Sequence, residues 1–230
     1  MRTGVVLPSF RSEPDEALTA AAEAERVGVD GVFCYDHLWP MGQPDRPAIA
    51  PFPLLAAIAA RSPRLVVGTL VARVGLVPSD VLVSQFEALA VLAPGRVVAA
   101  LGTGDHLSAA ENMAYGVPFA SAEERREELG TAGRALQARG FPVWIGAGAR
   151  RTVALAEAEG MAVNMWNAAP HQVADQAGRS EVTWAGTVPD GGIGQLLEDL
   201  ATAGATWAVF AGPVDLAALA AAARALARGH

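Results

Sequence analysis

Two ionisable side chains stand side by side where an apolar segment of the chain ends. Asp36 and His37 follow "GVFCY" (31–35), and a tryptophan, Trp39, comes shortly after them. Alternation along a strand sends Asp36 and His37 to opposite faces, so a surface role explains at most one of them if both faces are covered. A histidine at such a position is suited to proton transfer. The alternative is a core histidine that is bonded to a backbone carbonyl.

Two further segments combine glycine with polar residues: "GTGDH" (102–106) and "GAGARR" (146–151). A glycine-rich turn before a helix offers free N–H groups and the positive end of the helix dipole, which suit a phosphate. The second segment matches neither the Walker pattern nor a Gly-x-Gly-x-x-Gly fingerprint, and it can also be a plain tight turn. In the first segment, Asp105 can equally serve as a cap for the residues that follow it.

Short β-rich segments alternate with helical patterns along the chain, the arrangement that produces a parallel sheet or barrel. The predicted strands are 3–8, 31–37, 65–74, 96–104, 142–149, 161–166, 181–186 and 206–212. The predicted helices are 12–28, 52–62, 78–95, 121–140, 150–159, 193–203 and 213–228, and 167–180 is a poor helix. Eight such units in about 200–250 residues predict a (β/α)8 TIM barrel, because open doubly wound sheets usually carry fewer strands. We expect residues 1–230 to form one domain.

Local signals mark the ends of several predicted helices. Ser12 is a candidate cap of the first helix, and Gly28 is expected to stop it. Ser121 and Glu124 have the spacing of a capping box. These signals place the helices between the strands, as the barrel requires.

In a TIM barrel the active site lies at the carboxyl ends of the strands, so the residues that end each strand test the idea. The second predicted strand ends in Asp36, His37 and Trp39, the fourth in "GTGDH", the fifth in "GAGARR" and the sixth in "NMWN". Polar residues, glycine and tryptophan therefore gather at one rim of the predicted barrel.

The composition excludes several classes of function. The chain has 230 residues, of which 52% are hydrophobic and 18% charged, and its net charge of -7 gives no basic field for nucleic acid. No uninterrupted apolar run reaches about 18 residues, so no membrane span is expected. The apolar stretch before Pro8 is too short for a signal peptide, so none is expected either. Cys34 is alone, which fits a reducing cytoplasm and excludes a cysteine metal cluster. His37 and His106 have no partners at metal-ligand spacing, so we expect no metal.

Taken in order, the strand ends resemble the bacterial luciferase-like monooxygenase superfamily, and within it the branch that uses the deazaflavin coenzyme F420. The resemblance rests on "GVFCYDHLWP" (31–40), the block from "VVGTL" to "GTGD" (66–105), "YGVPF" (115–119), "PVWIGAGARRTVALAEAEG" (142–160) and "MWN" (165–167). It implies a TIM barrel with F420, or alternatively FMN, at its carboxyl-terminal mouth. It also implies a small-molecule substrate and a homodimer.

The resemblance assigns roles to residues at these strand ends. It makes His37 and Asp105 the catalytic candidates, with the histidine beside the reacting ring and Asp105 at the position of an acidic proton donor. A non-proline cis peptide backing the ring falls near Leu70 and Val71. The cofactor-binding candidates are Asp36, Leu70, Val71, Thr103, Gly104, Gly146, Ala147, Gly148 and Ala149. The substrate-pocket candidates are Trp39, His106 and Trp166.

One departure from the family pattern affects the predicted function. Relatives commonly carry an insertion that helps close the substrate pocket, where this chain joins a helix directly to a strand through "ALQARGFPVWIG" (135–146). We therefore expect a somewhat trimmed barrel that transfers a hydride between F420 and a small organic substrate. Two alternatives are an FMN-dependent monooxygenase and a barrel that binds a flavin or F420 without catalysis.

Overall fold

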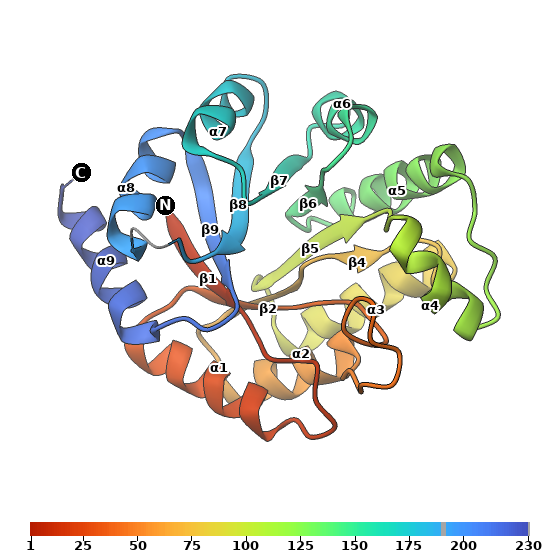
Figure 1. The fold of residues 1–230 in the computed structure, drawn as a ribbon, viewed down its shortest axis with the longest axis horizontal. Coiled ribbons are helices and arrows are strands. Elements are labelled where there is room, and N and C mark those ends of the chain that lie inside the picture. The colour runs from red at the N-terminus through yellow and green to blue at the C-terminus, as the bar shows by residue number, and fades with distance from the viewer. Residues whose placement is uncertain (190–191, 230) are drawn as a thin grey trace.

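The computed structural model describes residues 1–189 and 192–229 and shows a closed barrel of parallel strands surrounded by helices (Figure 1). Its strands are β1 (Arg2–Val6), β2 (Gly31–Cys34), β3 (Val66–Thr69), β4 (Ala72–Arg73), β5 (Val97–Gly102), β6 (Val143–Gly146), β7 (Ala162–Trp166), β8 (Val182–Thr187) and β9 (Ala205–Ala211). β1 lies between β2 and β9, so the two ends of the chain contribute to the same sheet. The predicted (β/α)8 TIM barrel is confirmed.

The third strand position of the barrel is divided between two short strands, β3 and β4. β3 pairs with β2 on one side and with β5 on the other, and this second pairing closes the barrel. β4 pairs with the carboxyl-terminal end of β5. The segment 65–74, predicted as one strand, is interrupted between Thr69 and Ala72. The peptide bond between Leu70 and Val71 is cis, at the position that the family resemblance implied.

Helices cover the outside of the barrel (Figure 1). They are α1 (Asp15–Val27), α2 (Pro51–Arg61), α3 (Ser79–Leu92), α4 (Ala109–Ala114), α5 (Ala122–Gln137), α6 (Arg150–Ala158), α7 (Pro170–Ala177), α8 (Ile193–Thr202) and α9 (Leu216–Gly229), with a 3₁₀ turn, η1 (His106–Ser108), before α4. Gly28 ends α1 in the left-handed conformation, and Ser121 and Glu124 form the predicted capping box of α5. Ser12, in contrast, lies outside α1, whose cap position is Pro14.

The segment after β7 was predicted to be a poor helix, and that prediction is wrong. Residues 170–177 form α7, in which Pro170 occupies the first turn, where its missing N–H costs nothing. The side-chain oxygen of Gln172 accepts a hydrogen bond from the N–H of Ala169 at 2.9 Å. Val173 and Gln176 are buried, so packing against the barrel overrides the weak local propensity.

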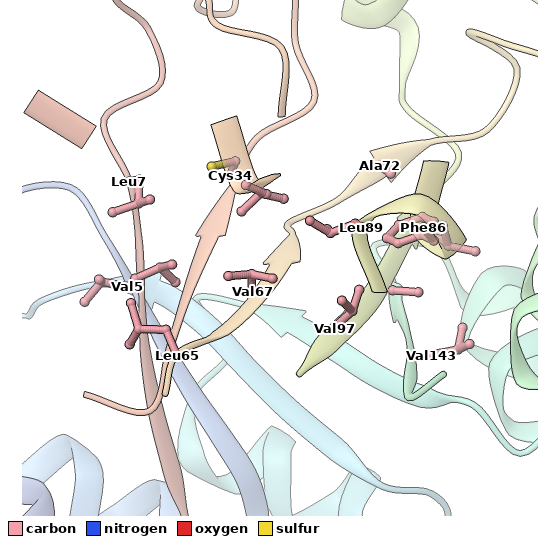
Figure 2. Packing of buried hydrophobic residues seen from close by; sticks show 14 of the residues in the cluster. Val5, Leu7, Cys34, Leu65, Val67, Ala72, Phe86, Leu89, Val97 and Val143 are labelled. Atoms are coloured by element: carbon pink, nitrogen blue, oxygen red, sulfur yellow. The ribbon is translucent and has the colours of Figure 1, made fainter. Parts of the chain in front are cut away.

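The outer face of the strands packs against the helices in one large apolar layer (Figure 2). Val67 and Val97 face outward from neighbouring strands, and Phe86 and Leu89 of α3 lie in the same layer. Cys34 belongs to this layer, where burial raises the pKa of its thiol to about 12. The lone cysteine is therefore a packing residue.

The inner face of the strands is filled by three large aromatic side chains. The ring of Phe33 stacks on Trp144 with a centroid distance of 5.3 Å and meets the edge of Trp207 at 5.8 Å. Glycines make room for these rings: a Cβ added at Gly68 would lie 2.8 Å from the carbonyl oxygen of Val98 and 3.0 Å from the ring of Phe33. The interior is thus a packed core below the mouth of the barrel.

Replacing Gly68 with alanine is expected to destabilise the protein by about 1–3 kcal/mol, because the added methyl overpacks the barrel interior against fixed backbone. Denaturant unfolding measures the change. Gly178→Ala is the matched control, since Gly178 has helical φ and ψ and its added Cβ would meet its nearest neighbour at 4.0 Å. Equal stability of the Gly68 and Gly178 variants would contradict the description of the interior.

Candidate active site

A cavity of about 730 Å³ opens at the carboxyl ends of the strands. Gly102, Gly146 and Trp166, which end β5, β6 and β7, all line it. Its lining also includes Phe10, Tyr35, His37, Met41, Leu70, Val71, Arg73, Thr103, Gly104, Asp105, Leu107, Ser108, Glu111, Ala147, Gly148, Ala149, Thr152 and Asn164. The cavity therefore occupies the place where a TIM barrel holds its active site.

Most of the residues singled out in the sequence meet at this cavity. Those that line it are His37, Leu70, Val71, Thr103, Gly104, Asp105, Gly146, Ala147, Gly148, Ala149 and Trp166. Asp36, Trp39 and His106 lie outside its lining. Asp36 accepts a hydrogen bond from the N–H of Arg73 at 2.9 Å, His106 is exposed at the start of η1, and Trp39 is half-buried in the loop after β2.

His37 is held by a carboxylate that sequence reasoning missed. Its Nδ1 lies 2.7 Å from Oε1 of Glu111, a residue of α4 that is 1% exposed. The other oxygen of Glu111, Oε2, accepts a hydrogen bond from the N–H of Leu38 at 2.8 Å. Glu111 thereby fixes both the imidazole of His37 and the backbone beside it.

The charge of Glu111 is balanced by Arg73, which lies on β4 and is 4% exposed. One guanidinium nitrogen donates to Oε2 of Glu111 at 2.9 Å. The others donate to the backbone oxygens of Ser108 and Asp36 at 3.4 and 3.3 Å. A buried carboxylate requires a partner of this kind, because an unpaired charge in the interior is very costly.

The network shifts the pKa values of two carboxyl groups in opposite directions. Burial alone would raise the pKa of Glu111, but the hydrogen bonds from His37 and Leu38, together with the charges of His37 and Arg73, lower it below 4.5. Burial dominates at Asp36 and raises its pKa despite the hydrogen bond from Arg73. The lowered pKa therefore favours the ionised form of Glu111 at neutral pH.

An ionised Glu111 determines which ring nitrogen of His37 carries the proton. A carboxylate can only accept hydrogen bonds, so Nδ1 of His37 must carry the proton that lies between them. The opposite ring nitrogen, Nε2, is then the one available to the cavity that His37 lines. In the neutral imidazole Nε2 is a base, and the adjacent carboxylate stabilises the cation that forms when it takes a proton.

Asp105 lines the cavity and also caps a turn. Its Oδ1 accepts a hydrogen bond from the N–H of Leu107 at 2.9 Å, and Ser108 completes a capping box. The side chain is exposed, with at least one oxygen engaged in the turn. The structure therefore contains the cap that the sequence allowed for Asp105.

The loop between β6 and α6 lines the cavity, and its backbone is not covered by side chains at Gly148. A Cβ added at Gly148 would meet nothing within 4 Å, so the space beside this residue is empty of protein atoms. The first N–H groups of α6 have no partner within the helix, as at any helix start, and they lie next to this loop. Such an N-terminus suits an anionic group such as a phosphate.

Arg73 and Glu111 are the functional residues that sequence reasoning missed, and only one of them left a signal. Arg73 interrupts the apolar segment "LVARVGLV" (70–77), where a buried cation needs a partner. Glu111 lies in "LSAAENMAYG" (107–116), a segment with no predicted element, so its burial could not be read from its neighbours. Only the fold brings it to His37.

A family model for luciferase-like monooxygenases matches residues 1–140. The chain belongs to this family. The match contains Asp36, His37, Arg73, Asp105 and Glu111, so the charged part of the site lies within the matched region.

Two relatives and one solved structure illustrate the similarity. An F420-dependent glucose-6-phosphate dehydrogenase of Microbacterium testaceum is 34% identical over 134 residues, which are 56% of this chain and 38% of the relative. An F420-dependent hydroxymycolic acid dehydrogenase of Mycobacterium tuberculosis is 32% identical over 127 residues, which are 55% of this chain and 34% of the relative. An F420-dependent secondary alcohol dehydrogenase, solved with an F420–acetone adduct, has the same fold with a TM-score of 0.80 at 14% identity over 98% of both chains.

Replacing Glu111 with glutamine is expected to cost about 3–5 kcal/mol of stability, because it leaves the buried Arg73 without its partner. The folded pKa of Glu111 is lowered, so its stabilising contribution is complete above pH 4.5 and is lost as the pH falls through the folded value. The difference in unfolding free energy between wild type and Glu111→Gln should therefore shrink as the pH falls below 4.5.

Denaturant unfolding at a series of pH values measures this difference. Glu87→Gln is the control, since Glu87 pairs with Arg139 at 2.6 Å on the surface, where a pair contributes at most about 1 kcal/mol. A loss for Glu111→Gln no larger than for Glu87→Gln would contradict the burial of the network.

Proposed function

We propose that this chain is an F420-dependent oxidoreductase that transfers a hydride between the deazaflavin and a small organic substrate. The observation that carries the proposal is the buried Arg73–Glu111 pair, which aims a ring nitrogen of His37 into a largely apolar cavity at the mouth of the barrel. The names of relatives that are 32–34% identical to this chain support F420 as the cofactor.

The cavity suits a flat ring system with a phosphate-bearing side chain. Its apolar lining includes Leu70, Val71 and Ala147, which provide a surface for a ring. The empty space beside Gly148 and the start of α6 provide a place for a phosphate. A volume of about 730 Å³ is of the size that ligand sites commonly have.

When bound, F420 supplies two-electron hydride chemistry at a ring carbon and, unlike a flavin, reacts poorly with oxygen. The protein must then place the substrate carbon nearby and manage one proton. His37 can take the hydroxyl proton of an alcohol at Nε2, or return it to a carbonyl in the reverse direction. Glu111 keeps Nδ1 protonated and so holds Nε2 ready for that proton.

Binding of the cofactor is the direct test of the proposal. Purified protein is titrated with F420 and, separately, with FMN, and binding is followed by absorbance and fluorescence. We expect F420 to bind more tightly. Equal or tighter binding of FMN would favour a monooxygenase, and binding of neither would remove the proposal.

Gly148→Leu is expected to weaken F420 binding at least about tenfold while the protein remains folded, because the side chain would fill space that the phosphate needs. A Cβ at Gly148 would meet no atom within 4 Å, so a side chain can start there without displacing the protein around it. Fluorescence titration measures the affinity, and circular dichroism checks the fold. Unchanged affinity in the folded variant would show that the phosphate binds elsewhere.

His37→Ala is expected to lower kcat about 10²–10⁴-fold, the usual contribution of a positioned acid or base, with little change in F420 affinity. If His37 acts only in the transition state, kcat and kcat/KM fall together. Steady-state kinetics beside a cofactor titration separates the two effects. Loss of F420 binding with normal turnover of the loaded enzyme would make His37 a binding residue instead.

Asp105→Asn separates the two roles available to Asp105. Asparagine also serves well as a cap but cannot carry the proton, so the turn before Leu107 should persist. We expect lower turnover with unchanged thermal stability if Asp105 assists proton transfer. Normal turnover of Asp105→Asn would leave Asp105 with its capping role alone.

We also propose that residues 1–230 act as one domain in a cytoplasmic homodimer. Support for one domain comes from the shared sheet, in which β1 pairs with β9. Support for a dimer comes from exposed apolar residues on α3, among them Val81, Val91 and Leu92. None of the described helices has the length and apolar character needed to cross a membrane.

A further inference from the structure

Three large apolar side chains in the lining of the cavity are exposed to solvent. Met41, Leu107 and Trp166 line it, and they are 55%, 48% and 50% exposed. They come from three separate parts of the chain: the loop after β2, η1 and the end of β7. Apolar side chains gathered at the edge of a cavity mark a surface that binds apolar ligands.

Aromatic rings continue this surface into the cavity. Phe10 and Tyr35 are stacked, with a centroid distance of 5.6 Å and an angle of 14° between their planes. The ring of Tyr35 lies 6.5 Å from that of Trp166. Burial raises the pKa of Tyr35 to about 12, so its phenol stays neutral. Together Phe10, Tyr35 and Trp166 form an uncharged aromatic wall.

The charged residues of the cavity are already committed to one another. Among the described lining residues, Arg73 carries the permanent positive charge, and all its side-chain nitrogens donate to Glu111 or to backbone oxygens. Glu111 and Asp105 bring negative charges to the same lining. The start of α6 is the place proposed for the cofactor phosphate, so a phosphorylated substrate would need a second anion site. Arginine or lysine normally forms such a site, and this cavity has no uncommitted one among those residues.

We propose that the substrate is an uncharged alcohol or carbonyl compound with an aromatic ring next to the reacting carbon, and not a sugar phosphate. The inference rests on the proposed function, because it concerns the same cavity. In the oxidising direction the alcohol loses a hydride from its carbinol carbon and a proton from its hydroxyl to His37. F420 would accept the hydride, the proton held by His37 would pass on to the reduced cofactor or to solvent, and a ketone or aldehyde would remain.

The aromatic wall gives such a substrate its orientation. A ring that packs against Tyr35 and Trp166 places its polar substituent toward the polar side of the cavity, where His37 lies 6.5 Å from Tyr35 between ring centroids. An edge or stacked contact between two aromatic rings adds to the gain from burying apolar area. The wall thus selects for a ring, and His37 selects for a hydroxyl or carbonyl group beside it.

Calorimetric titration with 1-phenylethanol, propan-2-ol and glucose 6-phosphate tests this assignment, with each probe added to the cofactor-free protein and to protein mixed with F420. We expect 1-phenylethanol to bind at least about tenfold more tightly than either other probe, because only it can use the aromatic wall. Trp166→Ala should weaken its binding about tenfold. Tyr115→Ala is the matched control, since Tyr115 is a 58% exposed aromatic outside the cavity lining.

The outcomes separate this inference from the proposed function. Failure of F420 to bind would remove the proposed cofactor, while the probes on cofactor-free protein would still decide the character of the wall. Glucose 6-phosphate binding as tightly as 1-phenylethanol to protein mixed with F420, where the cofactor occupies the phosphate place beside Gly148, would overturn the inference. Equal affinity of the Trp166 and Tyr115 variants for 1-phenylethanol would overturn it as well.

Discussion

The carboxylate of Glu111 is the constraint on which the arrangement of the site depends. It is buried at the barrel mouth, so it needs a cation and hydrogen-bond donors, and it finds them in Arg73 on β4, His37 after β2 and the N–H of Leu38. Satisfying one buried charge therefore ties α4 to two strand ends that are far apart in the sequence. The same contacts fix which nitrogen of His37 faces the cavity.

The aromatic core and the cavity lie at different levels of the barrel. Below the mouth, Phe33, Trp144 and Trp207 fill the interior, and Gly68 leaves the space that they need. Above them lies the cavity, whose lining includes the aromatic side chains of Phe10, Tyr35 and Trp166. Because the aromatic core supports the strands, the residues at the mouth are free to serve binding and proton transfer.

The sequence predicted the repeating pattern and the rim of the site well, because both depend on local order. Strand ends are readable from apolar segments that stop at polar residues, which is why His37 and Gly148 were expected at the mouth. The ion pair between Glu111 and Arg73 could not be predicted from the sequence. Glu111 lies in a segment without a predicted element, and Arg73 is 38 residues away from it. Asp105 was predicted as a proton donor or a cap, and the observed turn shows the cap. The helix at 170–177 was missed because tertiary packing stabilises it.

The central claim is that Glu111 holds His37 with the proton on Nδ1, so that Nε2 is the base that faces the cavity. ¹⁵N NMR of the histidine ring measures this directly in protein with labelled histidine, at about pH 9, where an ordinary imidazole is neutral. The account predicts that His37 is the Nδ1–H form in the wild type and that Glu111→Gln reduces its share. A neutral His37 with its proton on Nε2 in the wild type would contradict the account.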